Sequence, residues 1–63
     1  MSHVKTPPSA PQVLKARQAA GHTQKTAGEA IGAAMRTWQD WERGRRVMPW
    51  GMYELYLLKT GQR

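Results

Sequence analysis

The chain contains no cysteine, which excludes disulfide bonds, thiolate metal sites and cysteine nucleophiles together. Its two histidines, His3 and His22, lie too far apart to suggest a pair of metal ligands. Neither Ser9 nor any threonine has a plausible base and orienting acid, so nucleophilic catalysis has no support either. We therefore expect a protein without a metal or other cofactor, which is not an enzyme and takes no small-molecule substrate.

The sequence also lacks a long apolar run. The start, MSHVKTPPSAP, has neither the apolar core of a signal peptide nor the arginine-rich and serine-rich character of a transit peptide. The longest apolar clusters fall far short of the roughly 20 residues that span a bilayer. We expect a cytoplasmic protein that is not inserted in a membrane.

Acidic residues are scarce. Four Asp or Glu stand against ten Lys or Arg, which gives a net charge of +6 and a pI near 10.6. Such a domain is attracted to polyanions, and nucleic acid is the favoured one, although ribosome-associated and membrane-surface peptides share this basicity. A single domain of 63 residues buries only about 60% of its unfolded surface, so a partner is expected to add stability.

Helix signals begin after residue 8. Residues 1–8 include Pro7-Pro8 and few large apolar groups, so they are expected to form a mobile arm ahead of a domain at residues 9–63. Ser9 and Gln12 fit a capping box for a helix that runs to about Ala20. Its apolar stripe is expected at Val13, Leu14 and Ala20.

A second and a third helix follow closely. Thr23 is a suitable cap for a helix from about Gln24 to Ile31, with Ala27, Gly28 and Ile31 on its inward face. After the short turn Gly32-Ala33-Ala34, the next helix is expected from Met35 to Arg43. Trp38 and Trp41 face inward there, and the outward residues are Met35, Arg36, Gln39 and Asp40.

Two close helices with a small residue where they cross are what a helix-turn-helix requires. Gly28 costs roughly 1 kcal/mol in a helix relative to alanine, so its use is to let another helix backbone approach. The second helix of the pair then protrudes far enough to enter a major groove about 12 Å wide. The pattern therefore predicts a DNA-binding motif.

A fourth helix is expected from Trp50 to Lys59, with Pro49 at its start. Its inward side is expected to carry Met52, Leu55, Tyr56 and Leu58. Further apolar groups lie on another face and predict a dimer interface made by Trp50, Tyr53 and Leu57. For Trp50 and Tyr53 the core is the alternative. The predicted fold is all-α, a compact bundle of four short helices.

The segment from Leu14 to Pro49 carries Arg17, Gly21-His22-Thr23-Gln24, Gly28, Ile31-Gly32, Trp38 and Trp41-Glu42-Arg43-Gly44 in register without a gap. This pattern resembles the phage Cro and repressor type of helix-turn-helix. The tail MPWGMYELYLLKTG also looks like the end of small phage and plasmid regulators. The resemblance implies a dimeric DNA-binding transcription regulator, usually a repressor.

The resemblance also implies roles for single residues. Arg17 and Glu42 match an internal ion pair, which we interpret as structural. Gln24 matches a phosphate contact, and a helix N-terminus favours an anion there. The positions that match base-reading residues are Ala34, Met35, Arg36 and Asp40, with Gln39 as a neighbour that reaches a base or a phosphate. The remaining candidates for phosphate contact are Arg43, Arg45 and Arg46, with Lys25 and Lys5 as weaker ones.

Arg36 is the strongest candidate for reading a base, because a guanidinium bridges guanine O6 and N7. Its alternative is a phosphate contact. Met35 is expected to touch a thymine methyl group. Asp40 accepts from cytosine N4, excludes wrong bases or orients Arg36. His22 is interpreted as a half-buried filler.

The sequence departs from the family in three ways. Ala34 replaces a hydroxyl cap, Gly28 replaces an alanine, and we expect four helices where many relatives have a fifth. We expect a dimer, formed through the fourth helix, on a palindromic operator of double-stranded DNA. Two other classes stay open: an antitoxin-like protein that binds a partner as well as DNA, and a basic membrane-surface peptide. The tryptophans have a further alternative, stacking on single-stranded bases.

Overall fold

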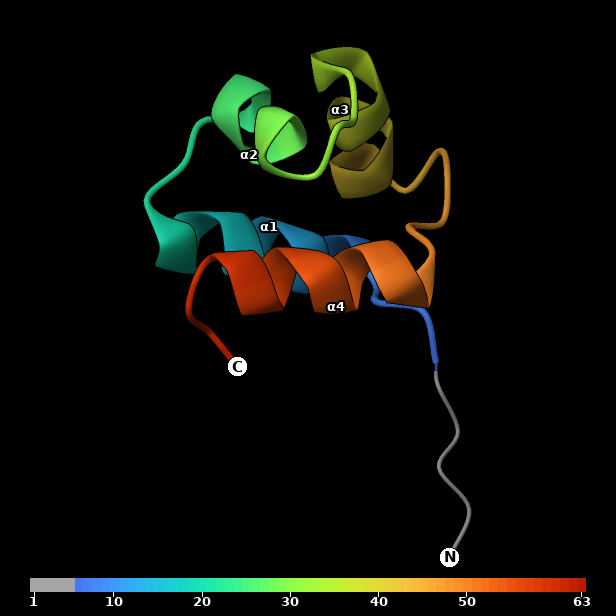
Figure 1. Ribbon diagram of the computed structural model, residues 1–63. Coiled ribbons are helices and arrows are strands. Elements are labelled where there is room, and N and C mark those ends of the chain that lie inside the picture. Colours follow the sequence, from blue (N-terminus) through green and yellow to red (C-terminus); the bar gives the residue numbers. More distant parts are fainter. Residues whose placement is uncertain (1–5) are drawn as a thin grey trace, which may run out of the picture.

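The computed structural model describes residues 6–63, which form four helices and contain no strand (Figure 1). The helices are α1 (Ala10–Ala20), α2 (Gln24–Ala30), α3 (Met35–Arg43) and α4 (Trp50–Lys59). The predicted all-α class is confirmed, and the predicted bounds hold except that α2 ends at Ala30 rather than Ile31. Most of the predicted arm, residues 1–5, and with it Lys5, lies outside the described residues.

The first two helices begin at side-chain caps. The Ser9 hydroxyl accepts a hydrogen bond from the Gln12 backbone N–H, and the Gln12 side chain accepts one from the Ser9 N–H (3.3 and 2.8 Å). The same reciprocal box joins Thr23 to Thr26. Each box satisfies backbone donors that the first turn of a helix leaves without partners. Pro8 was predicted to belong to the mobile arm, but it is buried. The chain therefore packs on the domain already before the Ser9 cap.

Gly28 permits a close backbone approach inside α2. A Cβ at this position would lie 2.5 Å from the Ala33 carbonyl oxygen, and the Gly28 oxygen accepts a hydrogen bond from the Ala33 N–H (2.8 Å). The close neighbour is therefore the turn between α2 and α3, whereas the sequence suggested a second helix. Gly32 in this turn has a φ of 72°, a conformation that glycine adopts without strain. The turn folds tightly against α2 and so sets α3 beside it.

The core forms where α2 and α3 lie over α1 and α4 (Figure 1). Tyr56 of α4 packs on Trp38 with ring centroids 4.8 Å apart, and Trp41 meets Trp38 edge to face at 5.7 Å. The Tyr56 hydroxyl pairs with Nδ1 of His22 (2.9 Å), which is half-buried as predicted. Both indoles are buried, so the stacking of single-stranded bases on them is excluded. The buried hydrophobic residues are Val13, Ala16, Ala27, Ile31, Trp38, Trp41, Met48, Tyr56 and Leu57.

The faces of α4 differ from the prediction. Leu57, expected on a dimer surface, lies in the core with 6% of its surface exposed. Leu55 and Leu58, expected inside, are 39% and 56% exposed. The reason is that the inward side of α4 is formed by Met52, Tyr53, Tyr56 and Leu57, which all pack on the core and fix the rotation of the helix about its axis. With 3.6 residues per turn, Leu57 shares the side of Tyr56, and Leu55 and Leu58 fall on the opposite side.

Candidate nucleic-acid interface

The outward side of α3 carries the residues predicted to read DNA. Because Trp38 and Trp41 are buried, the opposite side of the helix faces solvent. Met35 and Arg36 are exposed there, and Gln39 and Asp40 are half-buried. The helix begins without a side-chain cap, since Ala34 occupies the N-cap position and has no hydroxyl.

Asp40 lies one helical turn from Arg36. The Asp40 side chain is 15% exposed, against 74% for Arg36, and its Oδ1 lies 3.8 Å from the Arg36 Nε. This Oδ1 is buried and accepts no hydrogen bond from the described residues. The placement suits the predicted role in which Asp40 orients Arg36, because a carboxylate with 15% of its side chain exposed presents little surface to a base.

The turn after α3 holds a cluster of free cations. It begins at Gly44, whose φ is 77°, and the N–H groups of Arg45 and Arg46 both donate to the Asp40 carbonyl oxygen (2.9 and 3.3 Å). These two arginines and Arg43 are exposed, and no acid among the described residues pairs with them. Lys25 is exposed at the start of α2. The predicted phosphate-binding cations are thus available to an anion.

Glu42 accepts hydrogen bonds from three helices. Arg17 of α1 donates from Nε to Oε2 (2.6 Å) and from Nη2 to Oε1 (3.2 Å). Gln24 of α2 donates from Nε2 to Oε1 (3.1 Å), and the Trp38 indole N–H of α3 donates to Oε2. Four hydrogen bonds occupy the acceptor sites of the carboxylate. The predicted pair of Arg17 and Glu42 is therefore present as part of a larger network.

The network changes the titration of both members of the ion pair. Burial raises the pKa of Glu42, but the hydrogen bonds from Arg17, Trp38 and Gln24 outweigh it and hold that pKa below its ordinary value. The hydrogen bond to Glu42 raises the pKa of Arg17, although burial opposes the rise. Both shifts favour the charged forms, so the ion pair stabilises the junction of α1, α2 and α3.

Gln24 and Gln39 extend this network toward the outward side of α3. The Gln24 side-chain oxygen accepts a hydrogen bond from Gln39 Nε2 (3.2 Å) while Gln24 Nε2 donates to Glu42. Both ends of the Gln24 amide are therefore engaged within the protein. The sequence had predicted a phosphate contact for Gln24 and no contact inside the protein.

The comparison with known families matches residues 12–57 to the Helix-turn-helix domain, and this range includes all of α2 and α3. The chain belongs to this helix-turn-helix family. A search of curated proteins found no match. Within residues 6–63, no helix of this helix-turn-helix domain is long and apolar enough to cross a membrane.

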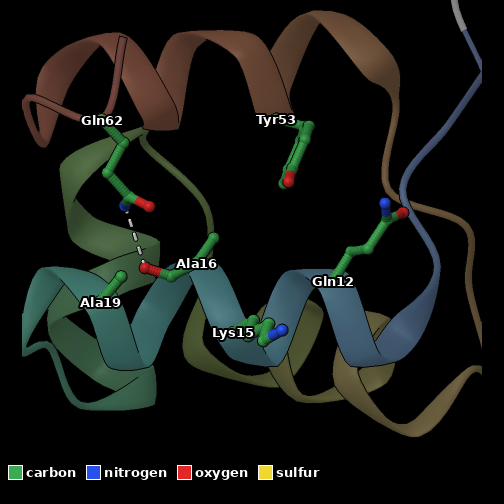
Figure 2. Close-up of a pocket in the computed structure, with 6 residues that line it drawn as sticks. All are labelled: Gln12, Lys15, Ala16, Ala19, Tyr53 and Gln62. Atoms are coloured by element: carbon green, nitrogen blue, oxygen red, sulfur yellow. Dashed lines mark hydrogen bonds between the residues drawn. The ribbon is translucent and has the colours of Figure 1, made fainter.

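The predicted dimer residues of the helix-turn-helix domain are engaged within the chain. Tyr53 points from α4 toward α1, into a hollow of about 470 Å³ between the two helices (Figure 2). Trp50 packs on Tyr53 with centroids 5.9 Å apart, and the Arg63 guanidinium lies 5.6 Å from the Trp50 ring centroid. The hollow is lined by Gln12, Lys15, Ala16, Ala19, Tyr53 and Gln62. Leu57 lies in the core. The three predicted dimer residues, Trp50, Tyr53 and Leu57, therefore form no single outward apolar face.

Two members of the Glu42 network were not predicted. Trp38 precedes Glu42 by four residues on α3, and this spacing brings side chains together on a helix, so the sequence held a signal for the contact. Gln24 comes from another helix, and no local pattern connects it to Glu42 or to Gln39. Only the packing of α2 on α3 brings these amides together.

Proposed function

We propose that the protein is a sequence-specific, double-stranded DNA-binding regulator of transcription, of the Cro and repressor type. The observation that carries this proposal is the anchoring of α3: its two indoles are buried, and Arg36 extends outward with a side chain that is 74% exposed. A helix presented in this way fits the major groove, where side chains read base edges. Membership of the helix-turn-helix family supports the same conclusion.

The proposed contacts fall into two groups. Arg36 and Met35 read bases, the former by a bidentate pair of hydrogen bonds to guanine and the latter by contact with a thymine methyl group. Phosphate contacts come from the exposed cations beside α3, which supply affinity that does not depend on sequence. These cations are Lys25, Arg43, Arg45 and Arg46.

We propose a homodimer on an inverted repeat, with two α3 helices in successive major grooves about 34 Å apart. The outer leucines of α4 do not suit this arrangement. Because Trp38 and Tyr56 pack α3 and α4 together through their inner sides, the outer sides of the two helices point away from each other. Two copies joined through Leu55 and Leu58 would carry their α3 helices at opposite ends of the dimer.

The turn between α3 and α4 suits the dimer better. Val47 in this turn is 70% exposed, and it follows Arg45 and Arg46 directly. A contact between two copies at Val47 keeps both α3 helices near the twofold axis and on one side of the duplex. Trp50, a predicted interface residue, lies three positions further on and is half-buried. Repression then follows from steric occlusion of a promoter.

The test is selection of bound sequences from random duplexes by the full chain, followed by titration of the selected site. Arg36→Ala is expected to weaken binding of the selected site by about 5- to 150-fold while leaving affinity for random DNA nearly unchanged. Arg45→Ala is expected to weaken binding of the selected site and of random DNA alike. It is also expected to reduce the slope of log binding constant against log salt concentration by about one, the loss of one phosphate contact. If the wild type selects no duplex sequence at moderate ionic strength, the proposal fails.

A second function is favoured by one observation. Leu55 and Leu58 are exposed apolar side chains on a side of α4 that points away from α3. An antitoxin-like protein would use such a surface for a protein partner while α3 binds DNA. Isolation of a stable complex with a second protein, lost in Leu58→Asp but retained in Arg36→Ala, would support this function.

A further inference from the structure

The amides of Gln24 and Gln39 have a fixed orientation in this fold. An ionised carboxylate only accepts hydrogen bonds, whereas a carboxamide has a donor end and an acceptor end. Glu42 Oε1 faces Gln24, so Gln24 must turn its NH₂ group toward Glu42 (3.1 Å). The Gln24 oxygen is then left for Gln39, whose NH₂ group donates to it (3.2 Å). The charge on Glu42 thereby sets the direction of both amides.

The carboxylate at the inner end of this chain cannot turn away. Arg17 binds both of its oxygens, and the Trp38 indole N–H donates to Oε2. The Trp38 side chain is fully buried, and the Glu42 side chain is 8% exposed. The Glu42 carboxylate is therefore held in one position. It orients the Gln24 amide, and the Gln24 amide in turn orients the Gln39 amide on the outward side of α3.

Gln39 retains one N–H and its side-chain oxygen for a ligand. Adenine offers a matching pair in the major groove, the N7 acceptor and the N6 amino donor, and glutamine binds it in a bidentate way. Guanine offers two acceptors, N7 and O6, and a phosphate group offers only acceptors. A guanine or a phosphate in this place would therefore leave the Gln39 oxygen facing another acceptor.

We propose that Gln24 is a positioning residue, through which Glu42 holds the Gln39 carboxamide in the orientation that recognises adenine. This inference rests on the proposed function, because it requires α3 to lie in the major groove. It assigns Gln24 a role inside the protein in place of the predicted phosphate contact. It also makes the ion pair of Arg17 and Glu42 part of the recognition of sequence.

The test uses the full chain and the site selected by the wild type. The position read by Gln39 is the one whose preference disappears in Gln39→Ala, and it is expected to be an A·T pair. Replacing that adenine by 7-deazaadenine removes the N7 acceptor, and the wild type is expected to lose affinity about three- to tenfold. Gln39→Ala is expected to bind both duplexes equally.

Gln24→Met keeps the size of the side chain and removes the amide. We expect it to reduce the loss caused by 7-deazaadenine to less than about twofold, while binding of random DNA stays as in the wild type. Thermal unfolding followed by circular dichroism checks that the variant is folded, and Gln12→Met, in the α1 cap, is the matched control that keeps full sensitivity to 7-deazaadenine.

Three outcomes separate the two proposals. If the wild type selects no sequence, the proposed function itself fails. If it selects a sequence but Gln39→Ala changes no A·T position, the function stands and the inference is overturned. If Gln24→Met weakens selected and random DNA equally and keeps the sensitivity to 7-deazaadenine, Gln24 is a backbone contact and the positioning role is wrong.

Discussion

Glu42 is the residue through which three helices of this small protein are joined. Its carboxylate accepts hydrogen bonds from Arg17 of α1, Gln24 of α2 and Trp38 of α3. The side chains of the ion pair are 19% and 8% exposed, so the charges are screened less than at a surface. A domain of 63 residues has a small free energy of unfolding. Because the junction involves three helices, the loss of one charge there destabilises all three.

Glu42→Gln is expected to lower the free energy of unfolding at pH 7 by about 3–5 kcal/mol, because it leaves the Arg17 charge without its carboxylate. The folded-state pKa of Glu42 lies below the ordinary value of 4.5. The stabilisation is therefore complete above about pH 4.5 and is lost as the pH falls through the folded pKa. Urea unfolding followed by tryptophan fluorescence should show the gap between wild type and variant narrowing below that pH.

The control for this prediction is Glu29→Gln, because Glu29 is exposed and lies outside the network. Its effect on the free energy of unfolding is expected to stay within about 0.5 kcal/mol. A gap between the wild type and Glu42→Gln of equal size on both sides of pH 4.5 would show that the carboxylate charge does not stabilise the junction.

At the scale of the elements, α2 depends on backbone geometry more than on apolar area. The inward side of α2 is small, consisting of Ala27 and Gly28 with Ile31 just beyond the helix. Its position is fixed by the turn, which approaches so closely that the Gly28 Cα has no room for a methyl group. The recognition helix α3 follows from that turn but starts at an uncapped end.

Gly28→Ala is expected to destabilise the fold by about 1–3 kcal/mol, although alanine is the better helix former, because its Cβ would meet the Ala33 carbonyl oxygen at 2.5 Å. Gly51→Ala is the matched control, since a Cβ at Gly51 in α4 meets nothing within 4 Å. This control is expected to stabilise the protein by about 0.5–1 kcal/mol. Thermal unfolding by circular dichroism measures both, and equal effects would refute the close approach.

Ala34→Ser is expected to stabilise the protein by about 1 kcal/mol. Ala34 already has the extended backbone of a cap residue, with φ −68° and ψ 151°, so a serine hydroxyl can accept from the first turn of α3. Hydrogen exchange of the α3 amides in the free protein should slow accordingly. Unchanged exchange rates would mean that the missing cap does not reduce the stability of the first turn of α3.

At the scale of the whole molecule, the free arginines and the exposed leucines lie on different helices and turns. The free arginines lie at the end of α3 and in the turn after it, whereas the exposed leucines lie on α4, whose outer side points away from α3. The side that binds DNA in the proposed function is therefore basic, and the opposite side is available for other contacts. Val47 is the exposed apolar residue next to the basic turn.

Val47→Asp is expected to reduce affinity for a full inverted repeat by about 100-fold or more, to that of a half-site, because the two α3 helices no longer bind as one unit. Leu58→Asp, at another exposed apolar position on α4, is expected to leave that affinity unchanged. Electrophoretic mobility shift with full and half sites distinguishes the two variants. The reverse pattern would assign the dimer to the outer side of α4.

The sequence by itself determined the all-α class, the helix bounds except the end of α2, the caps at Ser9 and Thr23, and the inward tryptophans of α3. These features follow from local rules, since capping residues, glycines and helical spacing act within a few positions along the chain. The pair of Arg17 and Glu42 came from the family pattern rather than from a local rule.

Only the tertiary structure decided which side of α4 is buried and what Gln24 binds. Apolar residues occur around most of α4, so periodicity alone cannot choose between Leu57 and the pair Leu55 and Leu58. The choice was made by the packing of α4 on the core, where Tyr56 meets Trp38, a residue 18 positions away, and Met52 and Tyr53 pack beside it. In the same way, the amide of Gln24 meets Glu42 and Gln39 only because α2 packs on α3. Contacts between helices depend on how the helices are placed in space, and that placement is a property of the whole core.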